Sequence, residues 1–174
     1  TNLERNLYLS TQIMELGIPV VMAINMMDLV QKSGNKIHID KLSKKLGCEV
    51  VEISALKGTG IMKAAEKAIS AAQSKKKTVP VHEFAQDVED AIKSVENKLT
   101  GTVAEAQKRF FAIKLIEKDD KIVEQMKSVP DVSYEVKALE DKFDDDTESI
   151  ITNERYVYIS CLLYTSPSPR DKRQ

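Results

Sequence analysis

Two short apolar runs stand out in the first third of the chain. Residues 20–24 are continuously apolar and are followed by polar Asn25, and residues 50–53 form a second, mostly apolar run. Runs of this length are typical of buried strands of a parallel sheet. Between them, residues 40–46 have a helical pattern that ends at Gly47. The order strand, helix, strand predicts a β-α-β unit.

Helical patterns flank this unit on both sides. Residues 1–16 open with a possible capping box of Thr1 and Glu4, and their apolar face is expected to pack on the sheet. A second helix is expected over residues 60–72. Its predicted inner face consists of Ile61, Ala65, Ala68 and Ile69.

Beyond residue 80 the pattern is helical throughout. Apolar residues recur first at spacings of three and four, which is typical of one face of an amphipathic helix: Phe84, Val88, Ile92, Val95 and Leu99. Thr102 and Glu105 are a candidate capping box for the next helix, which is apolar on more than one face and is therefore expected at the centre of a bundle. Two more helices are predicted, with apolar positions at Val132, Val136, Leu139 and Phe143, and then at Ile150, Ile151, Tyr156 and Ile159.

The segment SKKKTVP, residues 74–80, interrupts these patterns with a basic triplet and a proline. Such a stretch is typical of a solvated linker. We therefore expect an α/β domain over residues 1–74, a linker over 75–80 and a small all-α helical domain over 81–160. In this prediction the α/β domain is a partial one, in which the two parallel strands with their flanking helices are only part of a larger sheet.

Composition excludes some classes of function. With a net charge of −1 over 174 residues, the chain has no general affinity for polyanions, and nucleic acid is not an expected partner. No apolar run reaches the roughly 20 residues that span a bilayer, so the chain is expected to be soluble. Cys48 and Cys161 lack metal-ligand spacing, and His38 and His82 are expected to be surface or strand residues.

The acidic run DDD at residues 144–146 precedes the last predicted helix. Carboxylates suit a helix amino terminus, where the helix dipole favours negative charge. A site that gathers iron is the alternative interpretation. Because neighbouring carboxylates on a solvated turn are common, the structural interpretation is favoured, and no metal ligand is predicted.

Candidate chemistry lies where the two predicted strands end. Asn25 and Asp28 follow the first strand, and Ser54 and Ala55 follow the second. Ligands bind at the carboxyl ends of such strands. If the motifs share a pocket, the Asp28 carboxylate can accept two hydrogen bonds from guanine, the Asn25 amide can bond a ring nitrogen, and the Ala55 N–H can donate to the guanine carbonyl. The alternative is a strand-ending turn in which Asp28 is only a cap.

Longer runs carry a specific resemblance. The stretches TNLERNLYLSTQ, GIPVVMAINMMDL, KIHIDKLSKKLG and EISALKGTGI resemble the P-loop GTPase domain of the ferrous iron transport protein B (FeoB) family, and Arg155 with Tyr156 resembles the end of its cytosolic helical domain. The resemblance implies a GTP-binding domain, a helical domain and a membrane region that moves Fe²⁺.

The resemblance also implies site residues. Asn25, Met26 and Asp28 match one base-contacting motif, and a second comprises Ser54, Ala55 and Leu56. The implied ligand is GTP or GDP, with Mg²⁺ in the complete domain. Many other GTPases have lysine at the positions of Met26 and Leu56, so fewer polar contacts surround the base here, and weak nucleotide affinity is expected.

The phosphate-binding motif G-x-x-x-x-G-K-S does not occur in these residues. The family's phosphate loop and switch motifs belong upstream of Thr1, so this chain is expected to be a truncated fragment without GTPase activity of its own. At the other end, residues 161–174 resemble translated sequencing-adapter DNA and are expected to be a non-native tail.

The resulting hypothesis is the guanine-nucleotide-binding cytosolic portion of a GTP-regulated ferrous iron transporter. Its parent would place it at the cytoplasmic face of the inner membrane, joined to the parent's own membrane domain. Two alternatives remain open at this point. One is another small GTPase, associated with ribosomes or tRNA, and the other is a non-catalytic helical interaction module.

Overall fold

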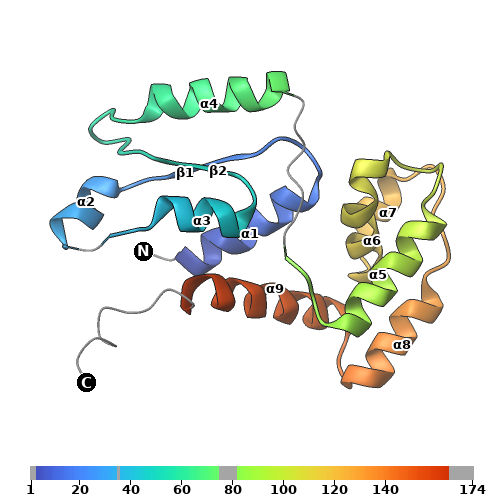
Figure 1. Ribbon diagram of the computed structural model, residues 1–174. Coiled ribbons are helices and arrows are strands. Elements are labelled where there is room, and N and C mark those ends of the chain that lie inside the picture. The colour runs from blue at the N-terminus through green and yellow to red at the C-terminus, as the bar shows by residue number, and fades with distance from the viewer. Residues whose placement is uncertain (1–2, 35, 75–81, 165–174) are drawn as a thin grey trace, which may run out of the picture. The chain divides into compact units, whose positions relative to one another are not determined.

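The computed structural model describes residues 3–34, 36–74 and 82–164 of the chain (Figure 1). By their internal contacts the residues form two compact units. One, here called the sheet unit, comprises residues 17–81. The other, the helical unit, comprises residues 1–16 together with 82–174.

The sheet unit contains the predicted β-α-β arrangement. Strands β1 (Val21–Ile24) and β2 (Glu49–Glu52) pair in parallel, with Val21 opposite Glu49 and Ile24 opposite Glu52. Helix α3 (Ile39–Leu46) connects them and ends at Gly47, whose φ of 71° closes the helix in the left-handed region that favours glycine. Helix α4 (Ile61–Ser74) packs on both strands. The predicted fold class, a partial α/β parallel sheet followed by a helical domain, is confirmed.

Two details of the sheet unit differ from the prediction. Strand β1 is only half-buried, and Ala23 is exposed, because β1 has a paired strand on one side only among the described residues. The predicted inner face of α4 is wrong: Ile61 and Ile69 are 44% and 58% exposed. The half-buried positions are Ala64, Lys67 and Ala71. Because α4 carries alanine on several faces, its pattern does not tell which face meets the sheet.

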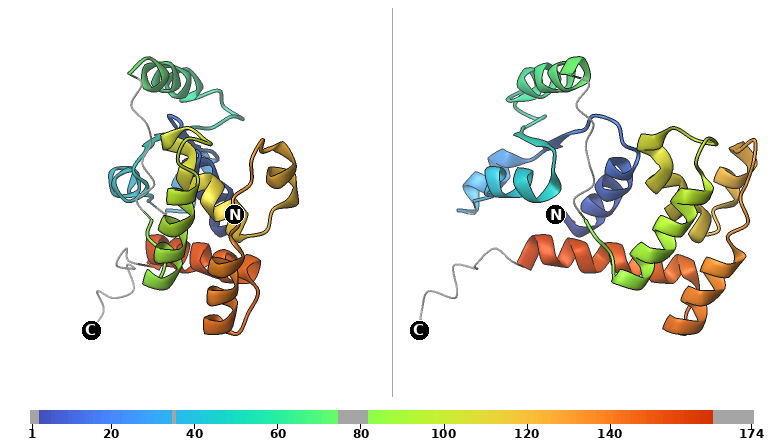
Figure 2. Two further views of the ribbon diagram at one scale, coloured as in Figure 1. Left: turned by 90° about the vertical axis from the view of Figure 1, so that its right-hand side faces the viewer. Right: turned by 45° about the vertical axis from the view of Figure 1, so that its right-hand side comes forward.

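The helical unit is built from α1 (Leu3–Glu15), α5 (Gln86–Lys98), the 3₁₀ turn η1 (Glu105–Gln107), α6 (Lys108–Ile116), α7 (Asp120–Gln125), α8 (Ser133–Phe143) and α9 (Thr147–Tyr164). Helices α6 and α8 both pack on α5 (Figure 2). The predicted stripe is confirmed on α5 for Val88, Ile92 and Val95, while Phe84 precedes this helix and Leu99 is its C-cap residue. All five are buried in the core together with Ala112, Ile113, Leu115, Ile116, Leu139, Ile150 and Ile151. Helix α6 is central, as expected, and contacts α1, α5, α7 and α9.

The two predicted capping boxes have different outcomes in the structure. Thr102 does not cap the helix that comes after it, because η1 intervenes and is preceded by Ala104 without a side-chain cap. The predicted cap at Thr1 lies outside the described residues.

At the start of α9, Asp146 accepts hydrogen bonds from the backbone N–H and the hydroxyl of Ser149, both at 2.9 Å. This acidic run therefore serves a helix terminus. Within the described ranges, no group of three or more His, Cys, Asp or Glu residues could hold a metal ion.

Helix α1 packs on α9 and α6 within the helical unit. Its inward face carries Leu7, Thr11 and Met14, all nearly fully buried, whereas Leu9 is 59% exposed. Within this unit the inward face of α1 is therefore covered by helices, and packing of α1 on the sheet stays a prediction. A group of charged residues that an apolar pattern does not reveal adds to the contact between α1 and these helices.

This group, here called the Arg155 cluster, consists of Arg155, Glu15, Glu117, Tyr8 and His82. The Arg155 guanidinium is fully buried and donates to both carboxylate oxygens of Glu15, at 3.1 and 3.3 Å, and to Glu117. His82 Nε2 lies 3.0 Å from Glu15 Oε1, and the His82 side chain is buried against Phe84 and Tyr158. The prediction of a surface or strand position for His82 is wrong, because His82 is buried as a partner of this carboxylate.

The cluster predicts a definite response to acid. Burial alone would raise the pKa of Glu15, but the hydrogen bond with His82 and the charge and hydrogen bonds of Arg155 lower it below its ordinary value of 4.5. A carboxyl group with a lowered pKa contributes stability that is present above the unfolded pKa and is lost as pH falls through the folded pKa. We therefore expect the free energy of unfolding to fall below about pH 4.5.

Thermal unfolding followed by circular dichroism across this pH range checks the expectation. Glu15→Gln should flatten the acid dependence, whereas Glu83→Gln, which changes an exposed carboxylate, should leave it as in the wild type. An equally steep acid dependence in Glu15→Gln would contradict the assignment to Glu15.

Among the helices described, none is long and apolar enough to span a membrane.

Candidate functional site

The two predicted motifs meet at the carboxyl ends of β1 and β2. The ladder continues past the strands, since Ile53 N–H donates to Ile24 O at 2.8 Å and Met27 N–H donates to Ile53 O at 3.2 Å. Directly after these bonds the Ser54 hydroxyl donates to Asp28 Oδ1 at 2.9 Å. Parallel pairing thus places a residue of each motif in contact with the other.

Asn25 joins the motifs a second time. Its Oδ1 accepts hydrogen bonds from the backbone N–H of Met26 at 2.7 Å and from that of Ala55 at 3.0 Å. The prediction assigns the Ala55 N–H to a guanine carbonyl, whereas in this structure that N–H is engaged by Asn25. Because Oδ1 accepts these two bonds, the group of Asn25 that can donate to a ligand is its amide NH₂.

Asp28 is an ionised acceptor at this site. Its residue is only 9% exposed and lies in the first turn of a short helix, α2 (Met27–Lys32). The hydrogen bond from Ser54 is the main cause that lowers the pKa of Asp28, and the charge of Lys57 and the backbone N–H of Leu29 act in the same direction. Since Ser54 bonds to Oδ1, Oδ2 remains able to accept from a ligand.

Met26 and Leu56 place apolar side chains at the site. They are 48% and 90% exposed. Met26 has φ 64°, in the left-handed region that is uncommon for a residue with a side chain, and this turn lets α2 begin directly after β1. The two side chains contribute no charge, in keeping with the departure from lysine noted in the sequence.

The loop after β2 is held in shape by its own backbone. Ser54 and Thr59 exchange two backbone hydrogen bonds, at 3.0 and 3.1 Å. Gly60, with φ 78°, lies so close to β2 that a Cβ there would be 2.2 Å from Glu52 O. Sequence reasoning assigned no role to Thr59, Gly60 or Lys57. The pattern G-T-G was a usable signal, because glycine is required where backbones approach this closely.

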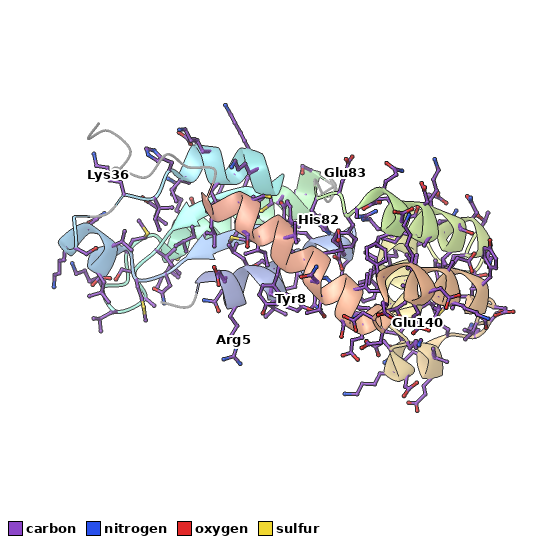
Figure 3. The ribbon with its side chains drawn as sticks, turned by 90° about the horizontal axis from the view of Figure 1, so that it is seen from below. Arg5, Tyr8, Lys36, His82, Glu83 and Glu140 are labelled. Carbon is purple, nitrogen blue, oxygen red and sulfur yellow. The ribbon has the colours of Figure 1, made fainter. Side chains whose placement is uncertain are left out.

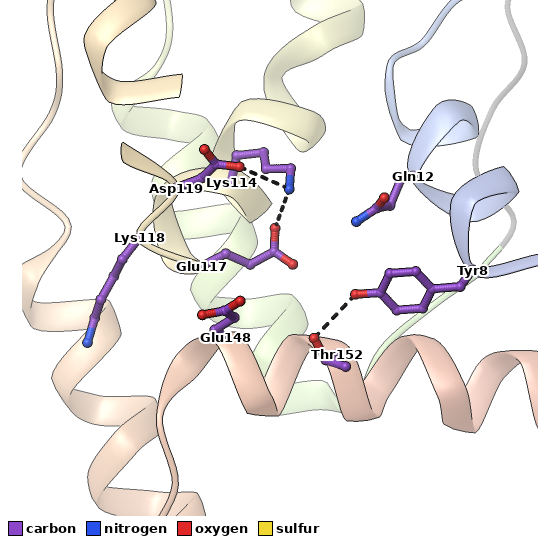
Figure 4. Close-up of a pocket in the computed structure, with 8 residues that line it drawn as sticks. All are labelled: Tyr8, Gln12, Lys114, Glu117, Lys118, Asp119, Glu148 and Thr152. Atoms are coloured by element: carbon purple, nitrogen blue, oxygen red, sulfur yellow. Dashed lines mark hydrogen bonds and ion pairs between the residues drawn. The ribbon is translucent and has the colours of Figure 1, made fainter. Parts of the chain in front are cut away.

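A separate polar cavity of about 260 Å³ lies in the helical unit, at the meeting of α1, α6 and α9 (Figure 4). It contains none of the predicted site residues. Tyr8 and Thr152 share a hydrogen bond of 3.2 Å, and Lys114 forms ion pairs with Glu117 and Asp119 at 3.0 and 3.2 Å. The charge of Lys114 is thus already neutralised by carboxylates of the same unit.

Comparisons with known proteins match both parts of the chain. A family model described as ferrous iron transport protein B matches residues 1–68, and a model of the FeoB cytosolic helical domain matches residues 84–165. The Fe(2+) transporter FeoB of Escherichia coli (strain K12) is 36% identical over 119 residues. That of Salmonella choleraesuis (strain SC-B67) is 51% identical over 61 residues. The alignments cover 68% and 35% of this chain, and the chain spans 15% and 8% of the lengths of these relatives.

Solved structures of the same family are similar to this chain. NFeoB from S. thermophilus bound to GDP·AlF4⁻ and K⁺ has a TM-score of 0.86 and 38% identity, with coverage of 92% of this chain and 64% of that one. The mGMPPNP-bound NFeoB from S. thermophilus gives a TM-score of 0.83 at 37% identity, covering 97% of this chain and 64% of that one. The chain therefore belongs to the ferrous iron transport protein B family, which it matches in the G domain and in the cytosolic helical domain.

Proposed function

We propose that this chain is the guanine-nucleotide-binding cytosolic portion of a GTP-regulated Fe²⁺ transporter, with Fe²⁺ as the cargo of the whole protein. One observation carries the proposal: Asn25 and Asp28 are hydrogen-bonded to Ala55 and Ser54 at the carboxyl ends of two parallel strands. Relatives of the same family support it, since their structures contain GDP or mGMPPNP.

Each residue has a role in this proposal. The Asp28 carboxylate accepts from N1–H and the exocyclic NH₂ of guanine side by side, one donor on each oxygen, and Oδ1 accepts its donor in addition to the bond from Ser54. Adenine lacks this pair of donors. The Asn25 amide NH₂ donates to N7. The Ala55 N–H, shared with Asn25 Oδ1 in the present geometry, donates to the guanine carbonyl when the base is bound. Met26 and Leu56 supply apolar contact with the base, so its binding depends chiefly on the hydrogen bonds.

The phosphates and Mg²⁺ belong, in this proposal, to other parts of the complete protein. The described residues include no cluster of carboxylates or histidines suited to a metal ion, so we assign Mg²⁺ to none of them. GTP hydrolysis and the movement of Fe²⁺ are likewise proposed for the whole transporter. The helical unit would then link the nucleotide-binding part, along the chain, to the membrane region of the same protein, on the cytoplasmic side.

Exchanging Asp28 for asparagine in the full-length protein tests the assignment. Asp28→Asn should weaken GDP binding by about tenfold or more, because a charge-assisted pair of hydrogen bonds is lost. It should also raise the affinity for xanthosine diphosphate, since the amide NH₂ can donate to the additional carbonyl of xanthine. Isothermal titration with both nucleotides measures the two effects.

Asp40→Asn is the matched control, because Asp40 is an exposed aspartate at the start of α3 and belongs to neither base motif. It should bind both nucleotides as the wild type does. Equal GDP affinity in Asp28→Asn and the wild type would show that this carboxylate does not contact the base.

A further inference from the structure

The base motif contains an exposed methionine. The side chains of the described residues are drawn in Figure 3, with sulfur in yellow. Among the methionines that the structure describes, Met26 and Met62 are exposed, at 48% and 71%, and the others are half-buried or buried. Met27, the next residue in the chain, is only 6% exposed. One of the two exposed methionines therefore lies between Asn25 and Asp28, at the carboxyl end of β1.

The backbone of Met26 is fixed on both sides. Its N–H donates to Asn25 Oδ1 at 2.7 Å, and its carbonyl oxygen accepts from the N–H groups of Leu29 at 2.9 Å and Val30 at 3.2 Å. These bonds hold Met26 at φ 64°, the turn that leads from β1 into α2. With the backbone fixed in this turn, Met26 cannot follow Met27 into the core, and it stays accessible to solvent.

A thioether in such a position is open to oxidation, because the susceptibility of methionine follows its exposure. A peroxide transfers one oxygen atom to the sulfur: the O–O bond breaks, a sulfur–oxygen bond forms, the sulfur loses two electrons and hydrogen peroxide is reduced to water. The product, a sulfoxide, is polar. Two thiols of a reductase reverse the step, since they supply two electrons and two protons, become a disulfide and release the oxygen as water.

The oxidised side chain would suit a bound base less well. In the proposed function Met26 and Leu56 supply apolar contact with guanine. The flat face of a base offers no hydrogen-bond donor, so a sulfoxide oxygen held against it would lose water without a replacement, which is unfavourable. Oxidation would therefore weaken binding of the base. A bound base would in turn cover the sulfur and slow its oxidation.

Resting on the proposed function, we propose that Met26 is an oxidation site that regulates guanine-nucleotide binding. A peroxide converts its thioether to the sulfoxide and lowers the affinity for GDP, and a dithiol reductase restores it. Because bound nucleotide covers the side chain, oxidation acts on the protein in its nucleotide-free state.

Peptide mapping by mass spectrometry tests the modification on the 174-residue chain without any nucleotide. After brief treatment with dilute hydrogen peroxide, sulfoxide should form at Met26 and Met62 before it forms at the buried Met14 and Met27. Fragment ions distinguish the two adjacent residues. Oxidation of Met27 as fast as that of Met26 would overturn the proposal, because Met26 would then not be the accessible sulfur of the base motif.

Nucleotide affinity of the full-length protein tests the regulation. Peroxide should raise the dissociation constant of the wild type for GDP by about fivefold or more, and sulfoxide reductase with a dithiol should restore it. Met26→Leu keeps an apolar side chain of similar size without sulfur, so it should bind GDP as the wild type does and keep this affinity after peroxide. Met62→Leu is the matched control at the other exposed methionine, and it should lose affinity as the wild type does.

Equal losses in Met26→Leu and the wild type would overturn the proposal, because other residues would then carry the effect. An unchanged constant in wild type that mapping shows to be oxidised at Met26 would also overturn it. If Met26→Leu fails to fold, Met26→Gln is measured instead: this polar side chain of similar length should weaken GDP binding without peroxide, and wild-type affinity would contradict the proposal. If the untreated wild type does not bind GDP, the proposed function fails and the regulation with it, while the mapping result still decides whether Met26 is an oxidation site.

Discussion

Arg155→Ala is expected to lower the free energy of unfolding of the helical unit by about 3–5 kcal/mol, the usual cost of removing one partner of a buried ion pair. Arg155 is fully buried, and its loss leaves Glu15 and Glu117 buried without their main cation. Because burial raises the pKa of an unpaired carboxyl, Glu15 would tend to take up a proton in the variant. The difference in free energy of unfolding between Arg155→Ala and the wild type should therefore become smaller as the pH is lowered.

Urea unfolding followed by far-ultraviolet circular dichroism measures this change. Arg5→Ala serves as the control, because Arg5 is an exposed residue of α1 and its loss should change stability by no more than about 0.5 kcal/mol. Similar stabilities for Arg155→Ala and Arg5→Ala would mean that the buried pair contributes little to holding the unit together.

Ile113→Ala is expected to destabilise the same unit by about 2–5 kcal/mol. Ile113 lies on the central helix α6 and is fully buried among residues of α5, α8 and α9. Its truncation removes apolar contacts and leaves a cavity that the surrounding helices fill only in part. The loss should appear as a lower midpoint in urea with an unchanged slope, since the folded and unfolded surfaces stay nearly the same.

Ile13→Ala provides the comparison at an exposed helical position. Ile13 is 38% exposed on α1, so the same change of side chain removes less buried surface and should cost clearly less. Equal losses for the two variants would contradict the assignment of α6 as the centre of the core.

The sequence predicted well those features that depend on spacing within one element. The stripe from Phe84 to Leu99 marks α5 and its two flanking residues, all on the expected buried face, and Gly47 marks the end of α3. The contact between Asp28 and Ser54 was likewise predictable, because residues that follow two adjacent parallel strands lie at the same sheet edge.

Features that depend on a distant partner were not predictable in this way. The apolar face of α1 does not reveal that Glu15, at the end of this helix, pairs with Arg155, 140 residues further along the chain. His82 was misplaced for the same reason. The short helix α2 was missed because it begins with the left-handed turn at Met26, a conformation that methionine does not signal.

The two glycines of the G-T-G segment should differ in the substitutions they tolerate. Both have positive φ, 69° at Gly58 and 78° at Gly60, but a Cβ at Gly58 would meet no atom within 4 Å. Asparagine, which adopts this conformation more readily than other residues with side chains, could therefore replace Gly58. At Gly60 the neighbouring Glu52 carbonyl excludes every side chain. In a library randomised at both positions and selected for nucleotide binding, variation would collect at 58 while 60 stayed glycine.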